Sequence, residues 1–359
     1  MQGCVGLVFD YYAGTRFRLL NTKAMLLMNF ASGPRIGDHV LPNAAFLAPM
    51  AGITDRPVRA IAERFGAGLV VSEMIASNAL ATGQRDMVRK LAKAGNLPHV
   101  VQLAGCEAQW IVRGAEIAQD AGADIIDLNF GCPAKRVTNG YAGSALMRVP
   151  DEALRLVDAA VAATGLPVTV KMRLGWDDDS LNAADIARRA VDAGVKMITV
   201  HGRTRQQFYK GGVRWNLVRS VVEAVDVPVV VNGDIIDLAT ARDALAQSGA
   251  AAVMIGRGAQ GRPWAVAQVG EALAGRPSPT APQGEALVDL ITEHYDATLE
   301  DYGIEVGVRA VRKHLDWYLE AAGIAPAKEA RWALLNSTDP RDAQRMIREL
   351  FLQPYREAA

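Results

Sequence analysis

Cysteine, net charge and long apolar runs are all scarce in this chain. The three cysteines, Cys4, Cys106 and Cys132, cannot form a paired framework and lack the close spacing of zinc or iron–sulfur ligands. Lys and Arg total 39, and so do Asp and Glu, so any nucleic acid must be bound through local patches. No apolar run approaches the ~20 residues of a membrane span. These absences predict a cytoplasmic protein with no metal site and no membrane partner.

The chain does contain eight short apolar runs, each ending in polar or glycine residues. They cover residues 45–48, 69–71, 100–101, 125–126, 168–170, 197–200, 229–231 and 252–255. Helical patterns such as 108–121 and 238–248 lie between them. This alternation predicts βα units around a parallel sheet, and their number fits one α/β fold, a (β/α)8 TIM barrel over residues 43–273. The alternative is an open, doubly wound sheet, which would not need polar groups at the end of every strand.

The segments that flank the barrel have a different character. Residues 1–27 show no clear period, and residues 1–42 are expected to form a partly flexible extension, with Met25 or Met28 as an alternative start. Residues 274–284 contain three prolines and are predicted to be a linker. Residues 285–359 return to helical spacing, which predicts a small all-helical second domain.

Charge is unevenly distributed within this helical tail. Residues 285–305 contain no Lys or Arg, whereas Arg309, Arg312 and Lys313 follow closely behind them. Their i, i+3, i+4 spacing places these three cations on one helix face. Such a face could hold a polyanion or could be an ordinary solvated surface, and the pattern alone leaves both interpretations open.

The segment Asp127-Leu-Asn-Phe-Gly-Cys-Pro133 is the strongest indication of chemistry. An apolar strand delivers an amide, a glycine turn and the thiol of Cys132 at its carboxyl end, where α/β barrels place their active sites. The alternative is a buried cysteine that acts only as a small hydrophobe. Lys171 ends another strand, where a lysine with no function would be unusual. His201 ends a third and is either a ligand-binding or a hydrogen-bonded core histidine.

Several strand-end motifs, taken in order, resemble the tRNA-dihydrouridine synthases. The motifs are Ala48-Pro-Met-Ala-Gly-Ile-Thr-Asp55, Asp127-Leu-Asn-Phe-Gly-Cys-Pro-Ala-Lys135, Val170-Lys-Met-Arg-Leu-Gly175, His201-Gly-Arg-Thr-Arg205, Asn232-Gly-Asp-Ile235 and Ile255-Gly-Arg-Gly258. The resemblance covers residues 45–265 and extends into the helical tail. Each motif is short, but their order and strand-like spacing make the combination specific. The pattern is closest to the bacterial B-type branch.

This resemblance implies an FMN barrel that uses NADPH to reduce the C5=C6 bond of uridine, giving 5,6-dihydrouridine in the D-loop of tRNA. The flavin N5 would deliver hydride to C6, and Cys132 would protonate C5. The cofactor-binding residues it implies are Pro49, Met50, Ala51, Gln102, Lys171, His201, Asn232, Gly233, Asp234, Gly256 and Arg257. The substrate-binding residues it implies are Asn129, Lys135, Arg136, Arg203, Arg205, Arg309, Arg312 and Lys313. We expect the protein to act as a monomer.

Two other functions compete with this interpretation. One is an FMN barrel that acts on a small molecule, as dihydroorotate dehydrogenases do, but such a substrate needs no basic helical platform around Arg309 and Arg312. The other is a non-catalytic RNA-binding barrel, but the presence of Cys132 and Lys171 argues against it.

Overall fold

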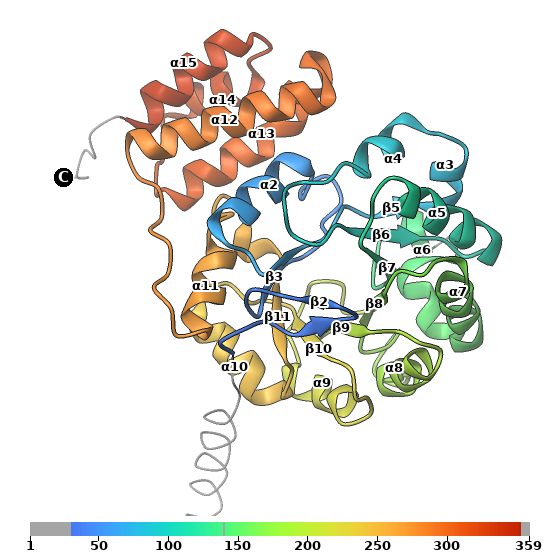
Figure 1. Cartoon of the computed structure of the whole chain (residues 1–359). Coiled ribbons are helices and arrows are strands. Elements are labelled where there is room, and N and C mark those ends of the chain that lie inside the picture. The colour runs from blue at the N-terminus through green and yellow to red at the C-terminus, as the bar shows by residue number, and fades with distance from the viewer. Residues whose placement is uncertain (1–29, 139–140, 353–359) are drawn as a thin grey trace, which may run out of the picture.

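The computed structural model describes residues 30–138 and 141–352, which form a barrel with a helical tail on one side (Figure 1). The possible starts at Met25 and Met28 lie outside the described residues. The hairpin of β1 (Arg35–Ile36) and β2 (His39–Val40) falls within the predicted extension. Ile36 is fully buried there, against core residues of the barrel such as Phe46. The hairpin therefore packs with the barrel and is part of its core.

A parallel sheet forms the wall of the barrel. Its strands are β3 (Ala45–Leu47), β4 (Leu69–Val70), β5 (Ile75–Ala76), β6 (Val100–Ala104), β7 (Ile125–Phe130), β8 (Val168–Arg173), β9 (Met197–His201), β10 (Val229–Asn232) and β11 (Ala252–Ile255). They are ordered β4-β3-β11-β10-β9-β8-β7-β6-β5, and a parallel bridge between Val71 and Val100 joins the two ends. Every predicted apolar run lies in this sheet, so the predicted barrel is confirmed. The two-residue strand β5 was not predicted.

Helices surround the sheet and cover its outer face (Figure 1). They are α2 (Arg56–Phe65), α3 (Ser77–Ala81), α4 (Arg85–Lys90), α5 (Ala108–Asp120), α7 (Pro150–Ala163), α8 (Ala183–Asp192), α9 (Trp215–Val222), α10 (Leu238–Ser248) and α11 (Ala265–Leu273). The loops after β7 and β11 add α6 (Lys135–Thr138), η1 (Gly143–Arg148) and η2 (Arg257–Ala259). Their boundaries follow local chemistry. In α10, for example, Asp237 and Thr240 form a capping box, and Gly249 ends the helix with a left-handed backbone.

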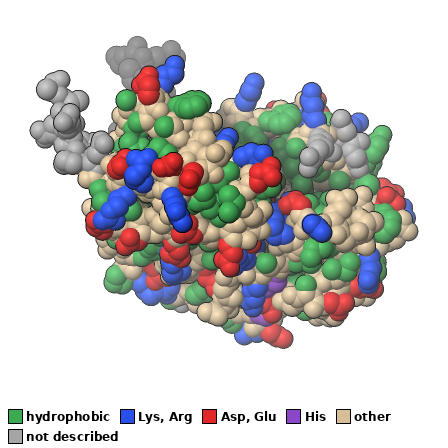
Figure 2. Space-filling model, turned by 90° about the horizontal axis from the view of Figure 1, so that it is seen from above, with side chains coloured by type: hydrophobic (Ala, Val, Ile, Leu, Met, Phe, Trp, Pro, Cys, Tyr) green, Lys and Arg blue, Asp and Glu red, His purple; other side chains and the backbone are tan. Residues whose placement is uncertain are grey.

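The tail is a bundle of α12 (Glu285–Tyr302), α13 (Ile304–Ala321), α14 (Lys328–Asn336) and α15 (Pro340–Phe351). Residues such as Ile291, Val311 and Ile347 form a separate core, which also takes in Ile61 and Trp264 from the barrel. This shared core holds the tail against α2 and α11. Acidic and basic side chains are interspersed over the face shown in Figure 2, in line with the zero formal net charge.

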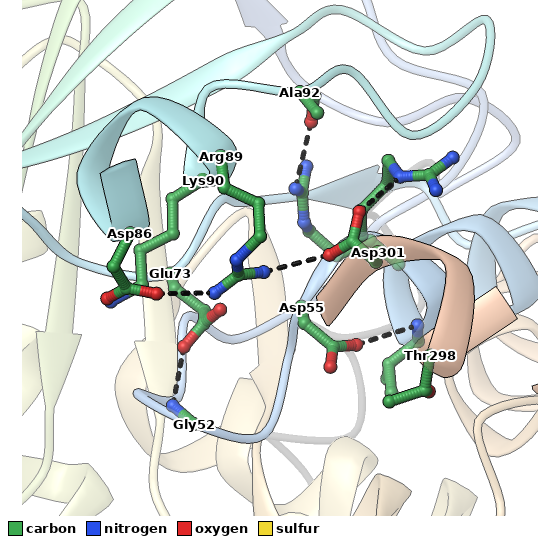
Figure 3. A network of polar contacts seen from close by, with 12 residues as sticks. Gly52, Asp55, Glu73, Asp86, Arg89, Lys90, Ala92, Thr298 and Asp301 are labelled. Atoms are coloured by element: carbon green, nitrogen blue, oxygen red, sulfur yellow. Dashed lines mark hydrogen bonds and ion pairs between the residues drawn. The ribbon is translucent and has the colours of Figure 1, made fainter. Parts of the chain in front are cut away.

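Ion pairs add a second attachment between tail and barrel (Figure 3). Asp301, near the end of α12, accepts hydrogen bonds from Arg56 Nε at 2.9 Å and Arg89 Nη1 at 2.8 Å. Its side chain is only 6% exposed, so these pairs are screened much less than surface pairs. They fix α12 relative to α2 and α4 on the barrel.

Candidate active site

A buried row of polar side chains crosses three neighbouring strands. Thr169 Oγ1 and Gln102 Nε2 donate to the two oxygens of Asp127, at 2.6 and 2.7 Å. Asn129 Nδ2 then donates to Gln102 Oε1 at 2.8 Å. Burial raises the pKa of Asp127, whereas its hydrogen bonds to Gln102 and Thr169 act in the opposite direction. Because the Asp127 carboxylate accepts a hydrogen bond from Gln102, it fixes the orientation of the Gln102 amide and, through it, that of the Asn129 amide.

This row ends on the turn that carries the thiol. Asn129 Oδ1 accepts from the backbone N–H groups of Gly131 and Cys132, at 3.1 and 2.9 Å. The carbonyl of Cys132 accepts from the backbone N–H and the hydroxyl of Ser144, at 3.1 and 2.8 Å. At Gly143, whose φ is +60°, an added Cβ would lie 2.8 Å from that carbonyl oxygen. Cys132 is therefore held on a fixed turn at the carboxyl end of β7, with its side chain partly exposed.

The predicted tRNA contacts of this loop lie just beyond the turn. Lys135 and Arg136 are both in α6, and Lys135 is exposed. The helix follows the thiol directly in the chain, so the Lys135 ammonium adds positive charge near the opening of the barrel.

Lys171 lies beside the row, at the register position paired with Asn129. Its Nζ donates to Asn232 Oδ1 at 3.1 Å, and Asn232 Nδ2 donates to the Met254 carbonyl at 2.8 Å. Burial, with a smaller contribution from Arg173, lowers the pKa of Lys171 to about 8. The amine is thus a half-buried cation with capacity for further acceptors, since an ammonium group carries three donors.

Arg173 was not among the predicted site residues, although it ends the same strand. Its Nε donates to the Gly131 carbonyl at 2.8 Å, and its Nη1 donates to the Phe208 carbonyl at 2.8 Å. Burial lowers its pKa to about 10. The guanidinium ties the turn before Cys132 to the loop after β9. Its place as a charged residue at the end of an apolar strand could have identified Arg173 from the sequence.

His201 and Gly233 lie side by side at the ends of β9 and β10. Within the described chain, His201 Nε2 is buried without a hydrogen-bond partner. Burial, followed by the charge of Arg173, lowers the pKa of His201, so the ring is neutral. A Cβ added at Gly233 would lie 2.8 Å from Val213 Cγ2 and 3.2 Å from that ring, so only glycine allows this close approach. The unpaired buried nitrogen of His201 fits a polar group of a cofactor.

Two predicted arginines near His201 have different environments. Arg203 is 2% exposed, and its Nη1 and Nη2 donate to Asp234 Oδ1 at 3.1 Å and to the Gly211 carbonyl at 2.7 Å. This burial argues against the predicted contact of Arg203 with tRNA. Arg257 also pairs with Asp234, at 3.0 Å, but its side chain remains 57% exposed. Asp234 thus serves as the anion that orients both guanidinium groups.

The loop of Pro49, Met50 and Ala51 follows β3 and lies close to Gly256. The Met50 N–H donates to Thr54 Oγ1 at 2.8 Å, and a Cβ added at Gly256 would lie 3.6 Å from Met50 Sδ. Glu73, which the sequence did not single out, accepts from the Gly52 N–H at 2.5 Å. Figure 3 shows Glu73 pointing at Gly52 beside the tail contacts.

The tail reaches this same loop. Lys313 Nζ lies 3.5 Å from the position a Cβ would take at Gly52. Arg309 is 55% exposed and pairs with Glu305 at 3.3 Å on the same helix. Arg312, which lies between Arg309 and Lys313 in the sequence, is partly buried. The predicted basic face of α13 therefore extends to the edge of the active-site opening.

The family described as dihydrouridine synthase (Dus) matches residues 46–355. The chain belongs to the dihydrouridine synthase family. A probable tRNA-dihydrouridine synthase of Rhodobacter capsulatus is 56% identical over 316 residues, covering 87% of this chain and 95% of that protein. The tRNA-dihydrouridine synthase B of Pseudomonas aeruginosa is 42% identical over 322 residues, covering 89% and 96%.

Solved structures of other proteins share the fold of this dihydrouridine synthase family member. Morphinone reductase aligns with a TM-score of 0.50 at 16% identity, covering 72% of this chain and 94% of its own. A 2-naphthoyl-CoA reductase aligns with a TM-score of 0.54 at 14% identity, covering 69% and 52%. At these identities the likeness establishes a common barrel.

Two further observations concern only the described residues, 30–138 and 141–352. No helix there is both long and apolar enough to cross a membrane. No group of three or more His, Cys, Asp or Glu side chains there is placed to hold a metal ion.

Proposed function

We propose that this chain reduces uridine in tRNA to 5,6-dihydrouridine, with FMN as the bound flavin, NADPH as the reductant and Cys132 as the acid. The family supplies the reaction class, because the relatives that match most of its length are named as tRNA-dihydrouridine synthases. The observation that carries the proposal is the fixed turn of Cys132, at the same barrel opening as Lys171 and the unpaired nitrogen of His201.

The residues around His201 fit a phosphorylated flavin. Gly233 and Gly256 present backbone without side chains at the ends of the last two strands, and Arg257 adds an exposed cation at the start of η2. Barrels commonly bind phosphate at this location. Lys171 would place its charge beside the edge of the flavin that becomes negative on reduction, and Met50 would pack against the ring. When bound, reduced FMN supplies the hydride for uracil C6.

The other polar residues would position the uracil. Asn129 uses one amide N–H for Gln102 and its oxygen for the turn, so one N–H remains to meet a uracil carbonyl. Gln102 also retains one N–H after its bond to Asp127, and this N–H would meet the pyrimidine edge of the flavin. Because the Cys132 turn is anchored by these same groups, the thiol proton and the uracil would be held in one frame. Cys132 then gives its proton to C5.

The base must leave the stacked tRNA to reach this opening, at a cost of a few kcal/mol. The basic face of Arg309, Arg312 and Lys313 would hold the tRNA phosphates, since Lys313 lies next to the active-site loop. Lys135 and Arg136 would contact phosphate from the thiol side. Because all these groups come from one chain, we propose that the protein acts as a monomer. We also propose that it acts in the cytoplasm.

Mapping of dihydrouridine in tRNA from a strain that lacks the gene tests the proposal. We expect one D-loop position to revert to uridine and to be restored by the wild-type gene. Unchanged dihydrouridine at every position would contradict the proposal. The purified protein should also show a flavin spectrum, and a colourless protein that takes up no FMN would leave only a non-catalytic barrel.

A further inference from the structure

Guanidinium groups and aromatic rings alternate along one side of the barrel opening. The Cζ atoms of Arg148 and Arg205 lie 4.9 and 4.7 Å from the centre of the Trp176 ring. Arg205 Cζ is also 4.5 Å from the Phe208 ring. These residues come from the loops after β7, β8 and β9, which are consecutive strands. Stacking on a ring restricts a guanidinium plane and leaves its N–H edges free to bind anions.

No carboxylate in the described residues forms a salt bridge with either Arg148 or Arg205. Arg148 is exposed, and Arg205 Nε is buried without a hydrogen-bond partner in the described chain. An acidic run follows Trp176, but Asp177 accepts from Ser180 at 2.6 Å and Asp178 pairs with Arg214 at 2.8 Å. Asp179 remains exposed. None of these three carboxylates pairs with Arg148 or Arg205, so the N–H groups of both arginines remain available to a ligand.

These arginines lie across the opening from the tail. The tail packs on α2, which follows β3, and β8 is the strand farthest from β3 around the closed sheet. In Figure 1, α7 and α8, which precede and follow β8, are on the side of the barrel away from α12–α15. An RNA arm laid across the opening would meet α13 at one edge and the Trp176 loop at the other.

We propose that Arg148 and Arg205, ordered by stacking on Trp176, form a second phosphate-binding site for tRNA, opposite the basic face of α13. The inference rests on the proposed function, because it takes tRNA as the substrate. It assigns contacts to Arg148 and Trp176, which have no role in that proposal. With phosphate held on both sides, the D-loop would be centred over Cys132 and prevented from pivoting about the tail.

The salt dependence of tRNA binding tests this site. In Arg148→Gln the log–log slope of affinity against salt should fall by roughly 0.7–0.9, the value expected when one phosphate is no longer neutralised. Trp176→Ala removes no charge but should weaken binding by roughly two- to fivefold, because the guanidinium groups lose their stacking partner. Arg155→Gln is the matched control, since Arg155 is an exposed arginine on α7 that pairs with Glu152. Its slope should equal that of the wild type.

Additivity provides the second readout. When Arg148→Gln is combined with Gln at Arg309, Arg312 and Lys313, the decreases in slope should add, because the two sites are separate. A wild-type slope for Arg148→Gln would overturn the second site, whatever the result for Trp176→Ala. Because Arg148 is exposed, we expect Arg148→Gln to fold normally. Failure of the proposed function would look different: wild-type protein would then neither bind tRNA nor form dihydrouridine.

Discussion

Asn129 on β7 and Gln102 on β6 are joined by a hydrogen bond of 2.8 Å from Asn129 Nδ2 to Gln102 Oε1. Gln102 is only 1% exposed, so its amide cannot rotate into solvent, and Asp127 beyond it sets its direction. The side-chain amides of Gln102 and Asn129 are therefore oriented by the Asp127 carboxylate, which is itself buried.

Asp127→Asn tests this orientation. The new amide can present N–H to Gln102 Nε2, so the two following amides lose their fixed direction. We expect uridine reduction by pre-reduced enzyme to slow by about 10²-fold, the scale of a small misplacement at a reaction centre. Thr169→Val is the control, because it removes a donor to Asp127 but leaves the Gln102 contact, and its effect should be smaller. A wild-type rate in Asp127→Asn would show that the row is only structural.

Lys171 predicts a pH dependence of cofactor binding. Its pKa is lowered to about 8, so the ammonium loses its proton as the pH rises through that value, whereas an ordinary lysine keeps it to ~10.4. We expect the affinity of flavin-free protein for FMN to fall above about pH 8. Lys171→Met should bind weakly and without this step. The affinity can be measured by titration with flavin fluorescence. A wild-type affinity for FMN that stayed constant between about pH 7 and about pH 9.5 would show that the Lys171 ammonium does not bind the flavin.

His294 predicts a pH dependence of stability. Burial lowers its pKa to about 4, against ~6.5 in an unfolded chain, so the unfolded state binds more protons between these values. Stability should therefore decrease as the pH falls from about 6.5 towards about 4. His294→Gln should reduce this loss only in part, because burial also lowers the pKa of His314. Chemical unfolding at several pH values in this range measures the free energy of unfolding. If this free energy fell equally with pH in the wild type and in His294→Gln, His294 would not be the group responsible.

The basic face of α13 predicts a salt effect of its own. Replacing Arg309, Arg312 and Lys313 with Gln should weaken tRNA binding and reduce the salt slope by roughly 0.7–0.9 for each phosphate that the variant no longer binds. Phosphate contacts supply affinity with little sequence information, so the modified position should not change. Equal slopes in the triple variant and the wild type would mean that the face is only solvated.

Much of the fold could be predicted because its strands are apolar on both faces and end in polar residues. The two-residue strand β5 and the β1–β2 hairpin are too short to produce such a pattern. The positions of Cys132, Lys171 and His201 at the carboxyl ends of strands could also be predicted, because each follows an apolar run. The pairing of Arg203 with Asp234 could not be predicted. It depends on the burial of Arg203, which arises only when the loops are folded.

Cys132 is proposed to supply the proton to uracil C5. The most direct test of this role is a single turnover in which NADPH-reduced enzyme is mixed with unmodified tRNA and dihydrouridine is quantified. Cys132→Ala should retain flavin and accept electrons from NADPH, yet form dihydrouridine about 10²–10⁴-fold more slowly, the usual worth of a positioned acid. Cys106→Ala, at an exposed thiol, should match the wild type. A wild-type rate of dihydrouridine formation in Cys132→Ala would show that Cys132 is not the acid.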